Sequence, residues 1–167
     1  MKNNNIIIRI DDRLVHGQVI VGWVKGMGLN NIVVANDPLL KDKLKMQLMK
    51  LAVPLGVNIE FLSIKETVEK FKLGKWKKFK SIILFESPKD AYEFLKEVEG
   101  INSINVGGLH FKENRKQLTP NIAVDKEDIE YLIKINELGI KMEGRALPTE
   151  DSYDVFKLIE KNGNNTI

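Results

Sequence analysis

Apolar residues in this chain fall into short runs that alternate with stretches of helical spacing. The runs occupy residues 6–10, 31–35, 58–62, 81–85, 104–106, 121–124 and 140–142. Short apolar runs bounded by turn residues are typical of buried strands. Between them apolar positions recur every three or four residues, as on the buried side of a helix. The pattern predicts seven strands separated by helices.

Capping residues set the limits of the predicted helices. Ser63 and Glu66 have the spacing of a capping box, which opens a helix continuing to about residue 71. Ser87 before Pro88 is a strong N-cap for a helix over residues 90–98. The other helices are predicted from residue 17 to 24, over 39–53 before Pro54, over 127–138 after an Asp125 cap, and from a Thr149 cap to about Lys161.

Strands that alternate with helices indicate right-handed crossovers and a parallel sheet. We therefore expect an α/β fold with three layers, a mostly parallel twisted sheet with helices on both faces. The 167 residues suffice for one core, so a single domain over residues 1–167 is expected, with a frayed tail at residues 163–167. The turns after strands one, two, four and five should share the carboxyl edge, where such sheets bind ligands.

Composition narrows the class of protein. Hydrophobic residues make up 43% and charged residues 29%, which is ordinary for a globular domain. The apolar runs are too short to span a bilayer, and Arg9 interrupts the first of them, so no membrane insertion or signal peptide is expected. The absence of cysteine excludes disulfides and thiol chemistry, and a cytoplasmic location is expected.

The turn after the first strand concentrates the polar chemistry. It contains Asp11, Asp12, Arg13 and His16, and Gly17 follows it at the start of a helix. The amino end of a helix favours a neutral imidazole or a bound anion, which suits a histidine that acts as a nucleophile toward phosphorus. The planar guanidinium of Arg13 is suited to holding phosphate oxygens bidentately. We therefore predict that His16 and Arg13 form a catalytic site.

The two aspartates of this turn admit two interpretations. Either Asp11 or Asp12 accepts the ring N–H of His16 and fixes its tautomer. Alternatively, one caps the helix and the other pairs with Arg13. Paired aspartates here are also typical of magnesium sites, but the companion residues are missing: the third strand ends without an aspartate and the fifth ends in glycines. No metal is expected.

Two further pairs of residues are candidates for phosphate binding. Gly17 and Gln18 begin the helix, and Gly107 and Gly108 end the fifth strand, where backbone N–H groups can approach an anion. The alternative for the glycine pair is a tight turn. The chain has no P-loop, dinucleotide fingerprint or nucleophile elbow, so no nucleotide or other cofactor is expected.

Two segments have less defined roles. Residues 70–80 (KFKLGKWKKFK) interleave basic and aromatic residues, as single-strand nucleic-acid surfaces do. The segment should lie at the edge opposite His16, so a solvated loop with Trp76 and Phe79 packed inward is expected, and the net charge of +3 gives no separate reason to expect nucleic acid. Residues 109–120 should form a long irregular loop, in which His110 has a loop or docking role.

Five segments together resemble one protein family over residues 6–159, nearly the whole chain. They are RIDDRLVHGQVIVGW, VVANDPLL, KMQLMKLAVP, NVGG and ALPTED, in that order. The chain is similar to the IIB component of the mannose/sorbose (mannose/fructose/sorbose/N-acetylgalactosamine) class of the bacterial phosphoenolpyruvate-dependent sugar phosphotransferase system. The first segment is highly specific, and the others support it.

The resemblance implies an α/β phosphotransferase that carries a phosphoryl group. A IIA partner would place the group on His16, in the R-L-[IV]-H-G-Q motif, and Arg13 would be the neighbouring phosphate ligand. The group would then pass to a sugar held by membrane IIC and IID subunits, with which the protein associates peripherally. A phosphohistidine sensor that transfers nothing, or a plain anion-binding module that uses the same turn, remains an alternative, distinguished by whether the phosphate leaves His16 for a sugar when membranes are supplied.

Overall fold

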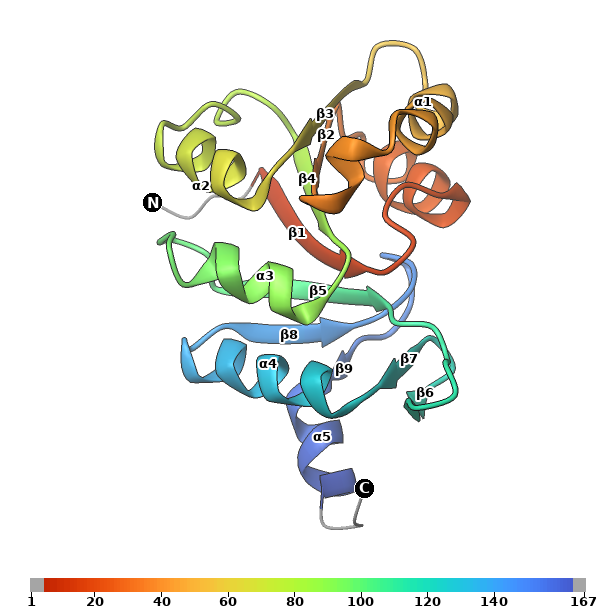
Figure 1. Ribbon diagram of the computed structural model, residues 1–167, viewed down its shortest axis with the longest axis vertical. Helices are drawn as coiled ribbons and strands as arrows, with labels where there is room; N and C mark the ends of the chain where they lie inside the picture. Colours follow the sequence, from red (N-terminus) through yellow and green to blue (C-terminus); the bar gives the residue numbers. More distant parts are fainter. Residues whose placement is uncertain (1–4, 164–167) are drawn as a thin grey trace.

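The computed structural model describes residues 5–163, whose main sheet has seven strands in the order β3-β2-β4-β1-β5-β8-β9 (Figure 1). Neighbouring strands are parallel except β8 and β9, which are antiparallel. The predicted α/β class with a mostly parallel sheet is confirmed. The strands are β1 (Ile6–Asp11), β2 (Asn31–Ala35), β3 (Asn58–Leu62), β4 (Ser81–Phe85), β5 (Ser103–Gly108), β8 (Lys141–Gly144) and β9 (Tyr153–Asp154).

Helices connect the parallel strands, and a separate antiparallel hairpin follows β5. The hairpin consists of β6 (Lys116–Thr119) and β7 (Ile122–Val124). The helical elements are the π-helix η1 (Val19–Lys25), the 3-10 helix η2 (Pro38–Lys41), and the α-helices α1 (Lys43–Ala52), α2 (Ile64–Lys72), α3 (Pro88–Leu95), α4 (Lys126–Glu137) and α5 (Val155–Gly163).

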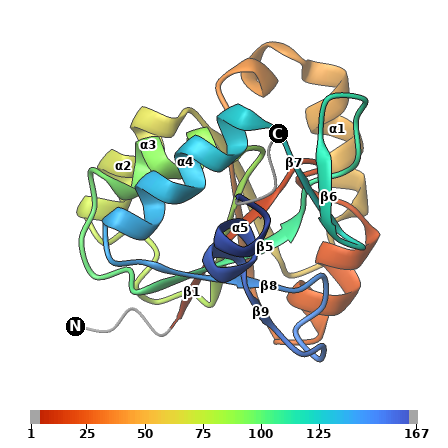
Figure 2. The same cartoon turned by 90° about the horizontal axis from the view of Figure 1, so that it is seen from below.

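Helices cover both faces of the sheet, as predicted. In Figure 2, α2, α3 and α4 lie on one side of the strands, and α1 lies on the other. Successive residues of a strand point to opposite faces, so Val33 and Ala35 of β2 join the core under α2 and α3, whereas Ile32 and Val34 join the core under η1 and α1. Both faces of β2 are buried, which explains its uninterrupted apolar run.

The carboxyl ends of the parallel strands meet at one edge of the sheet. After β2 and β4, Asn36 donates a hydrogen bond through Nδ2 to Glu86 Oε2 at 2.7 Å. After β1 and β5, the backbone N–H of Asp12 donates to Gly108 O at 2.9 Å. The prediction that these four turns share an edge is confirmed.

The expectation of an irregular loop over residues 109–120 is wrong in part. The loop contains β6, which pairs with β7, so the strand predicted at residues 121–124 belongs to the hairpin and not to the main sheet. The sequence KQLT of β6 has no apolar alternation, because Leu118 is the only apolar residue of this strand. A strand this short and polar leaves no hydrophobic signal.

Two predicted helices begin elsewhere. The helix expected over residues 39–53 is divided into η2 and α1, because Asp42 Oδ1 accepts a hydrogen bond from Lys45 N and starts a new helix. The final helix begins at Val155 and not after Thr149. Glu150 Oε2 accepts hydrogen bonds from the N–H groups of Ala146 and Leu147, which holds this segment as a loop. The chain then forms β9, which the sequence pattern does not reveal.

The remaining predicted helices have nearly the expected bounds. Ser63 and Glu66 form the predicted capping box of α2, Asp125 forms another with Asp128 at the start of α4, and Ser87 caps α3. The seventh strand is Lys141–Gly144, shifted slightly from residues 140–142. Of the predicted tail, Gly163 ends α5, and residues 164–167 lie outside the described residues.

Candidate functional site

The turn between β1 and η1 has an unusual backbone conformation. Leu14 has a φ of 58°, in the left-handed region that side chains other than glycine rarely adopt. Its N–H donates to Asp11 O at 2.9 Å, which closes the turn, and its side chain is completely buried among residues of η1. Burial of Leu14 therefore compensates for the strain and fixes the turn, with Arg13 exposed on one side and His16 at the start of the helical segment.

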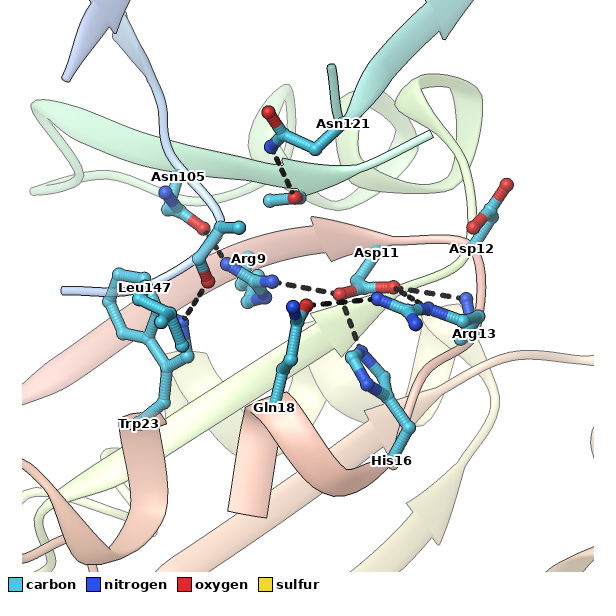
Figure 3. A network of polar contacts seen from close by, with 12 residues as sticks. Arg9, Asp11, Asp12, Arg13, His16, Gln18, Trp23, Asn105, Asn121 and Leu147 are labelled. Carbon is cyan, nitrogen blue, oxygen red and sulfur yellow. Dashed lines mark hydrogen bonds and ion pairs between the residues drawn. The ribbon is translucent and has the colours of Figure 1, made fainter. Parts of the chain in front are cut away.

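Asp11 holds His16 in place. The two residues are joined by a 2.8 Å hydrogen bond between His16 Nε2 and Asp11 Oδ2 (Figure 3). The same carboxylate oxygen accepts a hydrogen bond from Arg9 at 2.8 Å, and the side chains of Arg9 and Asp11 are completely buried. His16 is 15% exposed. A buried charge pair thus fixes the imidazole at the carboxyl edge of the sheet.

The Arg9 guanidinium is enclosed by residues from distant parts of the chain. It donates to Asn105 Oδ1 and to Arg145 O, and it lies 5.0 Å from the centre of the Trp23 ring. Asn105 in turn donates to the carbonyl groups of Glu143 and Arg145, and Trp23 donates to Ala146 O. These contacts fix the cation that holds Asp11; Figure 3 shows Arg9 between Asn105, Asp11 and the Trp23 ring.

The protonation state of Asp11 determines the tautomer of His16. Burial would raise the pKa of Asp11, but the hydrogen bond from His16 and the charge of Arg9 outweigh that effect and lower it. An ionised carboxylate only accepts hydrogen bonds, so His16 Nε2 carries the hydrogen. In the neutral ring the lone pair is then on Nδ1, for which residues 5–163 supply no side-chain partner.

Gly107 and Gly108 lie in the buried end of β5, against this charge pair. The sheet register shifts here, so that Ile10 pairs with Val106 and Asp11 with Gly108, which leaves Gly107 as the extra residue of a bulge. A Cβ on Gly107 would lie 1.8 Å from Arg9 Cζ, and one on Gly108 would lie 3.1 Å from Asp11 Oδ1. The glycines therefore make room for the charge pair, and their contact with phosphate stays a prediction.

Arg13, Gln18 and Gly17 form the exposed part of the site. The Arg13 side chain is 42% exposed, and its guanidinium donates to Gln18 Oε1 at 3.1 Å. Its backbone N–H donates to Asp11 Oδ1 at 3.1 Å. Apart from its two chain neighbours and the nearby helix backbone, no described residue has a heavy atom within 4 Å of the position of a Gly17 Cβ. An anion can therefore approach the first N–H groups of the helical segment beside the Arg13 guanidinium.

Asp12 points away from His16 and belongs to a second polar cluster. Its carboxylate accepts hydrogen bonds from the backbone N–H and Nδ1 of His110 and from Arg115. Arg115 also pairs with Asp128 of α4 at 3.3 Å. Of the two aspartates, the structure thus brings Asp11 to His16, whereas Asp12 fastens the His110 loop to the edge of the sheet.

Sequence reasoning missed two members of the site. Arg9 stood out only as a charge inside an apolar strand, although its place two residues before Asp11 puts both on one face of β1. Asn105 gave no signal, because its role depends on the parallel pairing of β1 with β5. A charged residue two positions before a site residue in a buried strand is the clue that was available.

The basic segment at residues 70–80 does not present its aromatic residues for base stacking. Trp76 is 1% exposed and donates to Glu60 Oε1, and Phe79 packs against the core. Lys70 pairs with the same glutamate at 2.8 Å. The expected inward packing of Trp76 and Phe79 is confirmed.

Two further observations concern residues 5–163 as a whole. No helix there combines the length and the apolar character that crossing a membrane requires. In the same part of the chain, no group of three or more histidine, aspartate or glutamate side chains is placed to hold a metal ion.

Comparison with known proteins places this chain in a family. The model of the "PTS system sorbose subfamily IIB component" matches residues 5–166. The fructose-specific EIIB component of Bacillus subtilis (strain 168) is 29% identical over 93% of this chain and 96% of its own length. The mannose-specific EIIAB component of Escherichia coli (strain K12) is 31% identical over 93% of this chain, which matches 48% of that relative.

A solved structure agrees in fold. The IIBSor domain of the sorbose permease from Klebsiella pneumoniae superposes with a TM-score of 0.86, at 28% identity, over 96% of this chain and 98% of that domain. The predicted resemblance is therefore confirmed. The chain belongs to the sorbose subfamily of IIB components of the sugar phosphotransferase system, which are phosphotransferases of sugar uptake.

Proposed function

We propose that this protein accepts a phosphoryl group on His16 Nδ1 from a IIA partner and passes it to a sugar held by membrane IIC and IID subunits. The observation that carries the proposal is the 2.8 Å contact between His16 Nε2 and the buried, ionised Asp11. It leaves the Nδ1 lone pair available at the carboxyl edge, beside a guanidinium and exposed N–H groups. This arrangement suits an imidazole nucleophile toward phosphorus.

Arg13 and the first turn of the helical segment would bind the transferred group. Phosphoryl transfer has a loose transition state, so alignment and cationic stabilisation dominate catalysis. A guanidinium about 4 Å from a phosphate oxygen contributes about 4 kcal/mol at an effective dielectric constant near 20, before solvent at this partly exposed side chain reduces it. Backbone N–H groups of Gly17 and Gln18 would bind further oxygens. Gly107 and Gly108 would contribute indirectly, by leaving room for the Arg9–Asp11 pair that positions His16.

The proposed steps need no metal or cofactor. In the first step, the bond between phosphorus and the histidine nitrogen of the IIA donor breaks as the bond between phosphorus and His16 Nδ1 forms. His16 Nε2 keeps its hydrogen throughout and donates it in the hydrogen bond to Asp11. In the second, the bond from Nδ1 to phosphorus breaks and a sugar oxygen takes the phosphoryl group. The sugar hydroxyl loses its proton to a base of the membrane partner, and His16 returns to its neutral state.

Relatives and the shape of the site support these partners. One relative is named as a joined EIIAB component, which links a IIB-like chain to a IIA unit. His16 lies at an open edge, where the protein donor and the membrane acceptor can reach it in turn. We therefore place the protein in the cytoplasm, associated peripherally with its transporter, with the sugar held by the partners and no nucleic acid involved.

Labelling by phosphorylated IIA tests the site. We expect wild type and His110→Ala to acquire an acid-labile, base-stable label and His16→Ala to acquire none. Nuclear magnetic resonance of ring-labelled histidine should place the phosphorus on Nδ1. Label on His16→Ala, or phosphorus on Nε2, would contradict the proposed site.

Transfer onward is tested with membranes that contain IIC and IID and with the sugar. The label should then leave His16 and appear on the sugar. A label that stays on His16 under these conditions would instead identify a phosphohistidine sensor.

A further inference from the structure

Helix α1 exposes a row of leucines on its outer side. Leu44, Leu48 and Leu51 lie on this helix and Leu55 follows it, and their exposed fractions range from 59% to 103%. At 100° per residue the three helical leucines fall within about 60° of one another. Single exposed leucines are common on proteins, but a continuous row marks an interaction surface.

The row lies opposite the side by which α1 packs on the protein. Met46, Met49 and Val53 contact the core under η1 and α1. An ordinary surface helix is polar on the opposite side, whereas α1 is apolar on both sides. In Figure 2, α1 lies on the opposite side of the sheet from α2, α3 and α4, and the exposed fractions of its leucines show that the described chain leaves this side of the helix uncovered. Packing within the described chain therefore gives no reason for these leucines.

Lysines accompany the leucine row. Lys41, Lys43, Lys45 and Lys50 are exposed, and none of the ion pairs found among residues 5–163 involves them. The acidic residue of this stretch, Asp42, accepts the hydrogen bond that caps α1. Residues 38–57 therefore carry a net charge of +3 from four lysines and one aspartate.

We propose that the leucine row of α1, together with the four neighbouring lysines of η2 and α1, binds an anionic phospholipid surface. Leucines that project from a helix insert at the boundary of head groups and acyl chains, while lysines beside them bind the head groups. A second copy of this chain is a less suitable occupant, because two such faces would bring together eight lysines, none of which is in an ion pair within residues 5–163. The lysines thus favour an anionic partner, and the projecting leucines favour a partner with a deformable apolar interior; an anionic bilayer has both properties.

The position of α1 relates this surface to the site. β2 ends at the carboxyl edge, and η2 and α1 follow it directly, so α1 begins at the edge that carries His16. A helix lying flat on the bilayer would hold that edge beside the membrane, within reach of a membrane-bound acceptor. This inference goes beyond the proposed phosphoryl transfer, and lipid binding is measurable without IIA, sugar or transporter.

Sedimentation with lipid vesicles tests the proposal on the full chain. We expect binding to vesicles of phosphatidylglycerol and phosphatidylcholine, little binding to phosphatidylcholine alone, and release in about 0.5 M salt. Leu44→Gln/Leu48→Gln/Leu51→Gln should weaken binding at least tenfold. Lys43→Gln/Lys45→Gln/Lys50→Gln should weaken it by about fivefold for each lysine. These side chains are exposed, so circular dichroism should show folded variants.

Matched variants on other surfaces serve as controls. Leu73→Gln/Leu138→Gln changes exposed leucines after α2 and α4, and Lys75→Gln/Lys77→Gln/Lys78→Gln changes the basic loop before β4. Both should bind vesicles like the wild type. The proposal fails if wild type does not bind anionic vesicles or if the α1 variants bind equally well. Self-association that the leucine variant abolishes, or binding only to vesicles containing IIC and IID, would assign the face to a protein partner instead.

Discussion

Gly107→Ala tests whether this glycine is needed for the charge pair behind His16. The added methyl group would lie 1.8 Å from Arg9 Cζ and 1.9 Å from the nearer terminal nitrogen. The guanidinium cannot easily move away, because Asp11, Asn105 and the Trp23 ring surround it. The substitution therefore has to displace Arg9 or deform the bulge in β5.

The expected loss of unfolding free energy follows from the interactions that are broken when Arg9 is displaced. Ordinary overpacking of a core costs about 1–3 kcal/mol. Displacing Arg9 also leaves the completely buried Asp11 without its cation, and breaking a buried pair in this way costs about 3–5 kcal/mol. We expect a loss of at least about 3 kcal/mol, equivalent to a decrease in Tm of about 10 °C for a chain of this size. Phosphorylation of His16 should slow as well, because Asp11 no longer holds the ring.

Urea unfolding measures the loss of stability, and labelling by phosphorylated IIA measures the rate of phosphorylation of His16. Both should be measured on the same preparations, so that the two effects can be separated. Gly17→Ala is the control for stability, because a Cβ there meets no atom within 4 Å apart from its chain neighbours and the nearby helix backbone. A Cβ on Gly108 would have its nearest contact at 3.1 Å, so the stability of Gly108→Ala should lie between those of Gly107→Ala and Gly17→Ala. The N–H of Gly107 is kept in the alanine variant, so a role limited to binding phosphate through the backbone predicts normal stability.

One result would refute the steric reasoning. That result is a free energy of unfolding of Gly107→Ala within about 0.5 kcal/mol of the wild-type value, which is the effect of an ordinary surface substitution. In that case Arg9 is not confined as the structure indicates. The glycine pair would then be better explained by direct contact with phosphate.

Three other predictions concern the site. Arg13→Lys should fold normally but slow phosphoryl transfer at least tenfold, because the bidentate fork is lost; full activity would show that Arg13 is only a surface charge. The pKa of Asp11 is lowered in the folded state, so its contribution to stability is present above about pH 4 and is lost as the pH falls below that value. The difference in unfolding free energy between wild type and Asp11→Asn should therefore shrink in acid, and a constant difference would contradict the shift. ATP with magnesium should not label the protein, whereas phosphorylated IIA should label it in excess chelator; the opposite result would indicate a kinase-like or metal-dependent site.

The local part of the site was predictable because its residues are close in sequence. Asp11, Arg13 and His16 lie within six positions, so a strand followed by a helix brings them together whatever the rest of the chain does. The same spacing left open which aspartate holds His16. The alternation of a strand decides it, because Asp11 shares the side of β1 that faces η1, whereas Asp12 lies beyond the strand and turns toward His110.

The contacts of Arg9 depended on tertiary structure. Its partners Asn105 and Arg145 are 96 and 136 residues away in sequence, and no local pattern reports a pairing at that distance. The same holds for Gly107, whose function is apparent only when β5 lies beside β1. Strand β6, its pairing with the predicted strand at residues 121–124, and the short strand β9 were missed, because β6 and β9 have few residues and no hydrophobic alternation.

The sequence by itself determined the α/β class, the parallel strands of the main sheet, most of the helices, and the turn that carries His16, because hydrophobic periodicity and capping act over a few residues. Only the tertiary structure decided the tautomer of His16, the burial of Arg9 beneath it and the outward direction of the leucines of α1. These features depend on which surfaces are buried against one another. That choice is a property of the whole packed chain, because burial is shared between segments that are far apart in sequence.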